Sequence, residues 1–395
     1  MLTDADPPTL TEFVHGARAW LAQQRAIGRA PADWGPILPP DRRDEGVAWQ
    51  RLIYHAGFAG LACPVSLGGA GLTADHEAAW LEECGRAGVP AVLNMVGLVL
   101  AVRCLLLFGS PTQQQVHVPP TLTGERIWCQ LFSEPGAGSD LASMTTRATA
   151  DGDGWVVSGQ KVWSSGARIS DRALLLARSD PDAPRHAGIS MFVLDLASAG
   201  VDIRPLRQMT GGSEFDEVFL TDVVLPPESL LGPLHGGWGV AMSALTNERG
   251  FIGSAVTGLG RRVDALCAGV RPSKSAGPAV GSPPEQEVSQ LEGPKRDRVA
   301  GLYARAGALR ALRDRQGPGA SVASSLLKLG MTELSYDLAM TSFDLAGFPA
   351  TAPGPVAAAV LAAPGARLGG GTSEIQRTII GERVLGLPPE PRPPA

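Results

Sequence analysis

The sequence has few of the residues from which metal sites and disulfides are built. Its five cysteines, among 395 residues, form no CxxC pair, and its six histidines are scattered. Such isolated cysteines are typical of reduced, buried thiols, and they match no zinc-ligand spacing. The sequence therefore offers no basis for a metal centre or for a His-based nucleophile.

Long apolar runs and basic clusters are also missing. The nearest approach to a membrane span, residues 91–108, is interrupted by Asn94 and Arg103 and is not an unbroken run of about 18 apolar residues. The net charge is -5 and the arginines are dispersed, which argues against a nucleic-acid partner. The acidic, Pro-rich start is unlike a signal peptide. We therefore expect a cytoplasmic protein without a membrane span.

Three regions of different composition indicate an α+β organisation. A chain of 395 residues exceeds one ordinary hydrophobic core. Residues 1–125 are Ala- and Leu-rich and predict an N-terminal helical domain, with helices near 73–87 and 93–108. Residues 126–235 carry short apolar runs between turn residues and predict a small β-barrel or sandwich. Residues 236–395 return to helical spacing, with a Pro/Gly/Ser-rich stretch at 271–294 that predicts a mobile surface loop.

The segment from Phe132 to Asp140 reads FSEPGAGSD and contains two glycines and a small alanine. Such a backbone can approach another molecule closely. Its amide groups and the hydroxyls of Ser133 and Ser139 can hold anionic or carbonyl oxygens. Short Gly-rich segments are weak evidence by themselves, so an ordinary turn entering the strand region fits as well.

Trp163 is followed by two hydroxyl residues, Ser164 and Ser165. An indole can pack against an aromatic ring while neighbouring hydroxyls donate hydrogen bonds to it. The alternative is a core tryptophan at the end of a strand. This motif alone therefore does not indicate a ligand.

Two further motifs lie in the last third of the chain. Three glycines, 369–371, lead into Thr372 and Glu374, a pattern that predicts a helix N-terminus behind a flexible loop. Such an end binds phosphate readily, although an ordinary capped helix explains it too. Glu248 and Arg249 begin an apolar stretch. A carboxylate in apolar surroundings can act as a base, whereas a Glu-Arg pair at a helix start is commonly a surface pair.

Together the four motifs resemble the acyl-CoA dehydrogenase superfamily across nearly the whole chain, from Gly60 to Pro388. The similarity is greatest to an actinobacterial branch that includes fatty-acid and sterol side-chain dehydrogenases. Residues 127–130, 210–215 and 247–249 are especially like that branch. The resemblance implies the fold of that superfamily: an N-terminal helical domain, a central β-barrel-like domain and a C-terminal helical bundle.

The resemblance also implies a bound FAD and assigns residues to it. The segment 130–139 would line the flavin ring, Trp163 and Ser165 would cover it near N5, and the C-terminal motif would touch the ribityl-to-adenine half. The cofactor-binding residues implied are Gln130, Leu131, Phe132, Ser133, Gly138, Ser139, Trp163, Ser164, Ser165, Thr372 and Glu374. The implied substrate-binding residues are Ser139, Arg249 and Gly370.

The position of the catalytic base departs from the commonest pattern of the superfamily. Many members carry a glutamate immediately before the Gly-Thr-Ser run, where this chain has Gly370. Isovaleryl-type members instead supply the base from the start of the first helix after the β-domain, which is the position of Glu248. The resemblance therefore assigns Glu248 as the base for the α-proton.

The reaction expected from the resemblance is FAD-dependent α,β-dehydrogenation of an acyl thioester, on CoA or on acyl carrier protein (ACP), to the trans-2-enoyl thioester. The hydride goes to flavin N5, and the backbone N–H of Gly370 and a flavin hydroxyl polarise the carbonyl. An electron-transfer flavoprotein or similar acceptor would take the electrons. The chain would form a homo-oligomer, either a dimer or a tetramer, or a heteromer with a related subunit. The Arg-x-x-Phe-Gly motif, through which relatives contact FAD across a subunit interface, is missing.

Two other functions on the same fold stay open from the sequence. One is a flavin-dependent monooxygenase, and the other is a non-catalytic partner subunit of a heteromeric dehydrogenase. The presence of Glu248 disfavours both, because neither needs a base for an α-proton.

Overall fold

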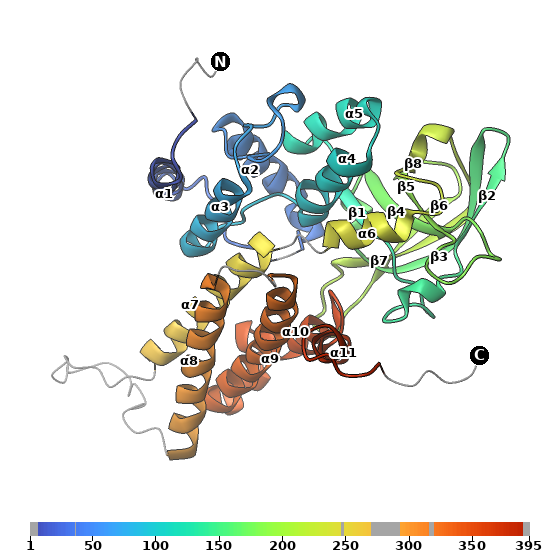
Figure 1. Ribbon diagram of the computed structural model, residues 1–395. Coiled ribbons are helices and arrows are strands. Elements are labelled where there is room, and N and C mark those ends of the chain that lie inside the picture. The colour runs from blue at the N-terminus through green and yellow to red at the C-terminus, as the bar shows by residue number, and fades with distance from the viewer. Residues whose placement is uncertain (1–6, 36, 246–248, 270–292, 316–319, 390–395) are drawn as a thin grey trace. The chain divides into compact units, whose positions relative to one another are not determined.

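The structure is a computed structural model that describes residues 7–35, 37–245, 249–269, 293–315 and 320–389. By its contacts the chain divides into two compact units, 1–251 and 252–395, and each is described by itself (Figure 1). The loop predicted at 271–294 lies almost entirely outside the described residues. No helix of the described part is long and apolar enough to cross a bilayer.

The first part of unit 1 is helical, as predicted. The helix expected at 73–87 is α3 (Ala74–Ala87). The segment expected at 93–108 is divided into a π-helical stretch, η3 (Val96–Ala101), and α4 (Val102–Phe108). The remaining helices before the sheet are α1 (Leu10–Ala26), α2 (Arg43–His55) and α5 (Pro111–Leu122), with short 3-10 turns η1 (Pro40–Arg42) and η2 (Val65–Leu67).

The second part of unit 1 is an eight-stranded sheet, which confirms the predicted mixed fold. Its strands are β1 (Trp128–Leu131), β2 (Arg147–Asp151), β3 (Gly154–Ser165), β4 (Arg172–Arg178), β5 (Ile189–Asp195), β6 (Val201–Leu206), β7 (Phe215–Leu225) and β8 (Leu230–Leu231). The sheet order is β6-β7-β3-β2-β4-β5-β8, and β1 pairs with β4 in parallel. The short η4 (Leu141–Ser143), η5 (Ala167–Ile169) and η6 (Pro227–Ser229) join strands, and α6 (Gly237–Leu245) follows them.

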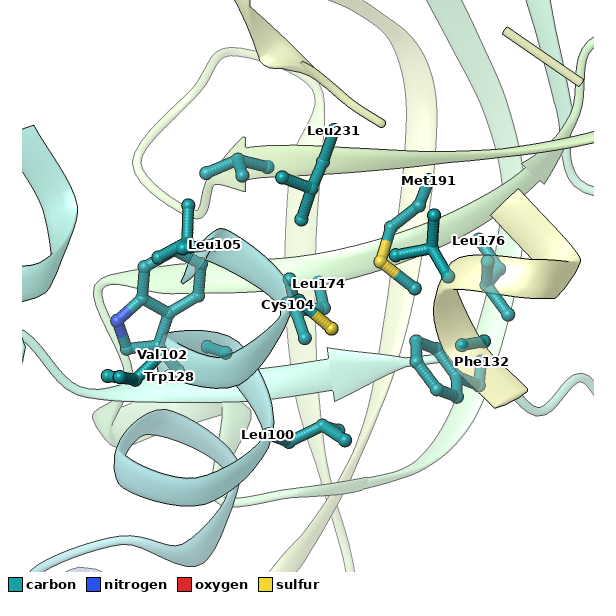
Figure 2. Packing of buried hydrophobic residues seen from close by; sticks show 14 of the residues in the cluster. Leu100, Val102, Cys104, Leu105, Trp128, Phe132, Leu174, Leu176, Met191 and Leu231 are labelled. Carbon is teal, nitrogen blue, oxygen red and sulfur yellow. The ribbon is translucent and has the colours of Figure 1, made fainter. Parts of the chain in front are cut away.

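One hydrophobic cluster packs the helices against the part of the sheet that contains β1. Side chains of η3 and α4 pack on those of β1, β4 and β5, and Trp128 is fully buried among them (Figure 2). Trp128 lies at one end of this cluster in Figure 2 and Phe132 at the other. The segment that follows β1 therefore starts from a rigid, water-free base. The four cysteines of unit 1 are free and buried, as expected, whereas Cys267 in unit 2 is only half-buried.

Unit 2 is a helical bundle. It contains α7 (Arg249–Gly269, which begins within unit 1), α8 (Gly293–Asp314), α9 (Ala320–Ala346), α10 (Pro355–Leu368) and α11 (Ser373–Arg383), with the turn η7 (Phe348–Thr351). Leu302, Ala306 and Leu309, which have helical spacing, are buried between α8, α7 and α9, and Leu312 at the same spacing is half-buried against them. Helix α9 packs against α8, α10 and α11 and is the central element of the unit.

Candidate functional site

The structure brings the first two motifs into direct contact. The chain leaves β1 through Phe132, and the backbone N–H of Val162 in β3 donates a hydrogen bond to the carbonyl oxygen of Ser133 at 2.9 Å. Glu134 and Ala137 exchange two backbone hydrogen bonds, of 3.1 and 3.0 Å, around a two-residue turn. The Gly-rich segment and the Trp163 segment thus form one surface, although about thirty residues separate them in the chain.

A buried ion pair joins the same two segments. The ammonium of Lys161 lies 2.9 Å from Glu134 Oε1 and donates to the carbonyl oxygen of Phe132 at 3.1 Å. Both side chains are withdrawn from water. The other oxygen of Glu134 accepts from the backbone N–H and the hydroxyl of Thr145, both at 2.7 Å, and Oε1 also accepts from Thr146 N–H at 2.9 Å.

The protonation of this pair follows from its surroundings. Burial by itself acts to raise the pKa of Glu134, but the Lys161 charge and the hydrogen bonds from Thr145 and Thr146 outweigh it, so the pKa falls well below its usual range. Burial lowers the pKa of Lys161, and the Glu134 charge opposes that shift. Glu134 is therefore a buried carboxylate whose two oxygens are already engaged by Lys161, Thr145 and Thr146, and its role is structural.

A β-bulge sets the orientation of Trp163. Between Lys161 and Ser164, β3 has one more residue than its partner β7, where the matching pairs are Val218 and Asp216. Trp163 takes a left-handed backbone conformation (φ 59°), which is rare for a bulky residue. Its indole is 58% exposed and meets Phe215 only edge-on. A strained backbone that presents a large aromatic surface to the outside is typical of a binding site.

The residues of this surface fit a flavin ring. The indole of Trp163 is exposed, and the glycines at 136 and 138 have open space where a side chain would lie. Ser165, two residues beyond Trp163 and half-buried, lies on the same face of β3 as Trp163, whereas the buried hydroxyl of Ser164, with which no described group pairs, lies on the other face. Exposed aromatic surface, a neighbouring hydroxyl and open backbone are what a planar ring with polar edges requires.

The predicted cofactor residues occupy different layers of the site. Gln130 and Ser133 are half-buried, whereas Gly138 and Ser139 are exposed. The side chains of Leu131 and Phe132 are buried in the hydrophobic clusters on opposite sides of β1. Any contact of Leu131 with a ligand would therefore come from its backbone.

A hollow of about 400 Å³ is lined by residues 142–145 and by the basic side chains of Arg147, Arg178 and Arg185. The guanidinium of Arg178 is held by three backbone carbonyls, including that of Ala142 at 2.6 Å. Arg185 pairs with the exposed Asp140 at 2.9 Å, an arrangement that solvent weakens. The hollow thus combines one fixed and two exposed positive charges.

In unit 2 the third motif forms the expected helix start. Thr372 is the N-cap of α11, and its hydroxyl accepts from Ile375 N–H at 3.2 Å. Gly370 and Gly371 both have left-handed φ values, of 66° and 91°. Glu374 is exposed at the first turn of α11, and the hydrogen bonds of its own backbone and Thr372 lower its pKa.

The fourth motif is described only in part. Glu248 lies outside the described residues, and Arg249 is the first residue of α7. The assignment of Glu248 as the base therefore stays a prediction.

Sequence reasoning missed the roles of Lys161, Glu134 and Lys328. Lys161 interrupts the apolar alternation of a strand, which is the signal of an inward-facing charge that needs a partner. The partner itself, 27 residues earlier in the chain, cannot be read from local spacing. Lys328 stands mid-helix on α9 and gives no local signal.

Comparison with known proteins gives the class of this fold and site. Residues 11–125, 129–223 and 235–385 match the descriptions "Acyl-CoA dehydrogenase, N-terminal domain", "middle domain" and "C-terminal domain". The chain therefore belongs to the acyl-CoA dehydrogenase family. Enzymes of this family depend on FAD, and this chain is a FAD-dependent oxidoreductase that dehydrogenates acyl thioesters.

Individual relatives agree with this assignment. The chain is 35% identical over 393 residues to the acyl-CoA dehydrogenase IpdE1 of Mycobacterium tuberculosis, covering 96% of this chain and 98% of that one. It is 34% identical to IpdE1 of Mycolicibacterium smegmatis over 96% and 98% of the two chains. Among solved structures it resembles the ChsE4-ChsE5 complex from Mycobacterium tuberculosis, with a TM-score of 0.75 and 24% identity over 98% of this chain and 100% of that one.

Proposed function

We propose that the chain converts an acyl thioester to its trans-2-enoyl thioester, with Glu248 as the base that removes the α-proton. When bound, FAD supplies the acceptor for the β-hydride. Ser133, Trp163 and Ser165 would hold the flavin ring, and the amide N–H of Gly370 would polarise the thioester carbonyl as negative charge develops on its oxygen. The observation that supports a flavin most directly is the exposed Trp163 at the bulge of β3, in the segment that hydrogen-bonds to Ser133.

The basic hollow at residues 142–147 supports a phosphate-bearing carrier. We propose that Arg147, Arg178 and Arg185 receive phosphate groups of the carrier, which CoA and the phosphopantetheine arm of ACP both possess. Ser139 precedes Ala142, the first lining residue of this hollow, by three residues in the chain, and we propose that it contacts the acyl end of the carrier.

The reaction is tested by anaerobic mixing of the FAD-loaded protein with a panel of thioesters. The panel contains straight-chain, branched and steroid-derived acyl-CoAs and the matching acyl-ACPs. Bleaching of the flavin absorbance identifies both the reaction and the preferred carrier. An enzyme that no thioester bleaches, but that consumes oxygen with NAD(P)H and a substrate, would be a monooxygenase instead.

The purified protein is expected to be yellow, with non-covalent FAD near one per chain. The missing Arg-x-x-Phe-Gly motif lowers the number of contacts to the ADP half, so part of the FAD is expected to be lost on dilution. The absorbance ratio at the flavin and protein maxima measures the content before and after added FAD. Colourless protein that takes up no added FAD would contradict the proposed site.

The chain is expected to assemble at least into a dimer. The solved structures of this fold include a complex of two chains, ChsE4 and ChsE5, so a related subunit is a candidate partner alongside a second copy. We also propose an electron-transfer flavoprotein or similar protein as the electron acceptor. Light scattering coupled to size exclusion measures the assembly, and a stable FAD-loaded monomer would refute it.

A further inference from the structure

Two side chains hold the carbonyl groups of the glycine loop in unit 2. The ammonium of Lys328, on α9, donates to the carbonyl oxygen of Gly371 at 2.6 Å. The side-chain amide of Gln376, on α11, donates to the carbonyl oxygen of Gly370 at 3.1 Å. Lys328 is half-buried, and burial lowers its pKa. Neither residue belongs to the assigned cofactor or substrate set.

These contacts fix the direction of the backbone N–H groups. A peptide group is planar, so a held carbonyl also fixes the N–H on its opposite side. Gln376 therefore orients the N–H of Gly371, and Lys328 orients that of Thr372. The N–H of Gly370 then depends only on the torsions of Gly370, whose φ of 66° lies in the left-handed well.

The loop needs such restraints because of its composition. Three consecutive glycines have the greatest conformational freedom of any tripeptide. Gly371 has a φ of 91°, which side chains rarely adopt, and a Cβ there would also meet the amide nitrogen of Gln376 at 2.8 Å, so this position favours glycine. No described residue accepts a hydrogen bond from the N–H of Gly370 or Gly371. The carbonyl oxygens of Gly370 and Gly371 thus accept hydrogen bonds, while the N–H groups of the same two residues are available to an acceptor on a ligand.

A second observation points to a polar ligand at this place. The hydroxyl of Ser373 is buried at the start of α11, and no described group pairs with it. Buried hydroxyls are normally hydrogen-bonded, so this one also awaits a partner.

We propose that Lys328 and Gln376 are positioning residues that keep the glycine loop in the conformation in which the Gly370 amide can polarise the thioester carbonyl. This inference rests on the proposed function of Gly370. Lys328 and Gln376 reach the loop from two different helices, α9 and α11.

The test uses the FAD-loaded enzyme and an arylacryloyl-CoA as probe. The absorption of such a conjugated thioester moves to longer wavelength when its carbonyl accepts strong hydrogen bonds. Lys328→Met and Gln376→Glu each remove a donor at nearly constant size. Both are expected to reduce this shift and to lower kcat by about ten- to a hundredfold, the scale of small misplacements in an active site, with little change in KM or FAD content. Lys328→Arg keeps a donor and should retain most of the shift.

The matched control is Glu333→Gln. Glu333 pairs with Arg377 and so joins the same two helices, α9 and α11, without touching the loop. If this variant loses the shift as Lys328→Met does, the effect comes from helix docking and the inference is overturned. It is equally overturned if Lys328→Met and Gln376→Glu keep the original shift and kcat. If the unaltered, FAD-loaded enzyme shifts neither this probe nor the flavin spectrum with any thioester, the proposed function itself fails.

Discussion

Replacing Glu248 by glutamine is expected to slow the reduction of FAD by an acyl thioester by about a hundredfold or more, the usual effect of losing a general base. Glutamine keeps the size and hydrogen-bonding capacity of the side chain but cannot accept the proton. Substrate binding and FAD content should therefore change little. Anaerobic stopped-flow measurement of flavin bleaching separates the rate of reduction from the affinity for the thioester.

The matched control for Glu248 is Glu382→Gln, which alters an exposed carboxylate on α11. It should leave the rate unchanged. Near-normal reduction in Glu248→Gln would show that another group is the base, and the mechanism would have to be withdrawn. Adding Gly370→Glu to Glu248→Gln tests the alternative position of the base. We expect little rescue, because a left-handed backbone costs a non-glycine residue about 1–2 kcal/mol.

Breaking the Lys161–Glu134 pair is expected to give the largest loss of stability. Lys161→Met leaves the Glu134 carboxylate buried without its counter-ion, which lowers the free energy of unfolding by about 3–5 kcal/mol. The substitution also removes the hydrogen bond to the carbonyl oxygen of Phe132, so the segment between β1 and η4 is held less firmly. The protein should therefore release FAD more readily. Chemical denaturation and FAD retention on a gel-filtration column measure the two effects.

A double substitution and an exposed pair serve as controls for the Lys161 prediction. Lys161→Met with Glu134→Gln removes both charges and should cost less than Lys161→Met alone. Arg298→Met breaks a solvent-exposed pair with Asp344 and should cost less than about 1 kcal/mol. Equal losses from Arg298→Met and Lys161→Met would contradict the role of the buried pair.

The same pair gives the enzyme a defined response to acid. The pKa of Glu134 is lowered to about 2 in the folded protein, so its stabilising contribution is complete above the ordinary carboxyl pKa and is lost as the pH falls toward 2. Glu134→Gln removes that contribution at all pH values. The variant should therefore lose less further stability than the unaltered enzyme between about pH 4.5 and pH 2.

Much of the fold could be predicted from local patterns. The strands β4 and β5 are continuous apolar runs, and α3 has a regular apolar side, so each follows from side-chain periodicity. The division of the 93–108 segment into π- and α-helical parts could not be predicted. The π-helical stretch is packed within the cluster that surrounds Trp128, and that tertiary contact is not encoded in the spacing of its own residues.

The segments that form the site could be predicted from the sequence, but their arrangement in space could not. Ser133 and Trp163 were both identified, yet only the hydrogen bond from Val162 to Ser133 shows that they share a surface. The bulge depends on how β3 pairs with β7, a partner more than fifty residues away in sequence. Positions whose conformation is imposed by distant pairing are the ones that local sequence rules miss.

The extra residue in β3 limits which insertions and deletions this strand can tolerate. In a regular strand, residues three apart point to opposite faces, yet Lys161 and Ser164 are both buried. The bulge supplies the one-residue offset that allows this. Deleting either Val162 or Trp163 would exchange the faces of Ser164 and Ser165 while leaving every remaining side chain intact. Between Lys161 and Ser164 the chain length is thus fixed by the burial of both flanking side chains, so homologues should hardly ever show an insertion or deletion here.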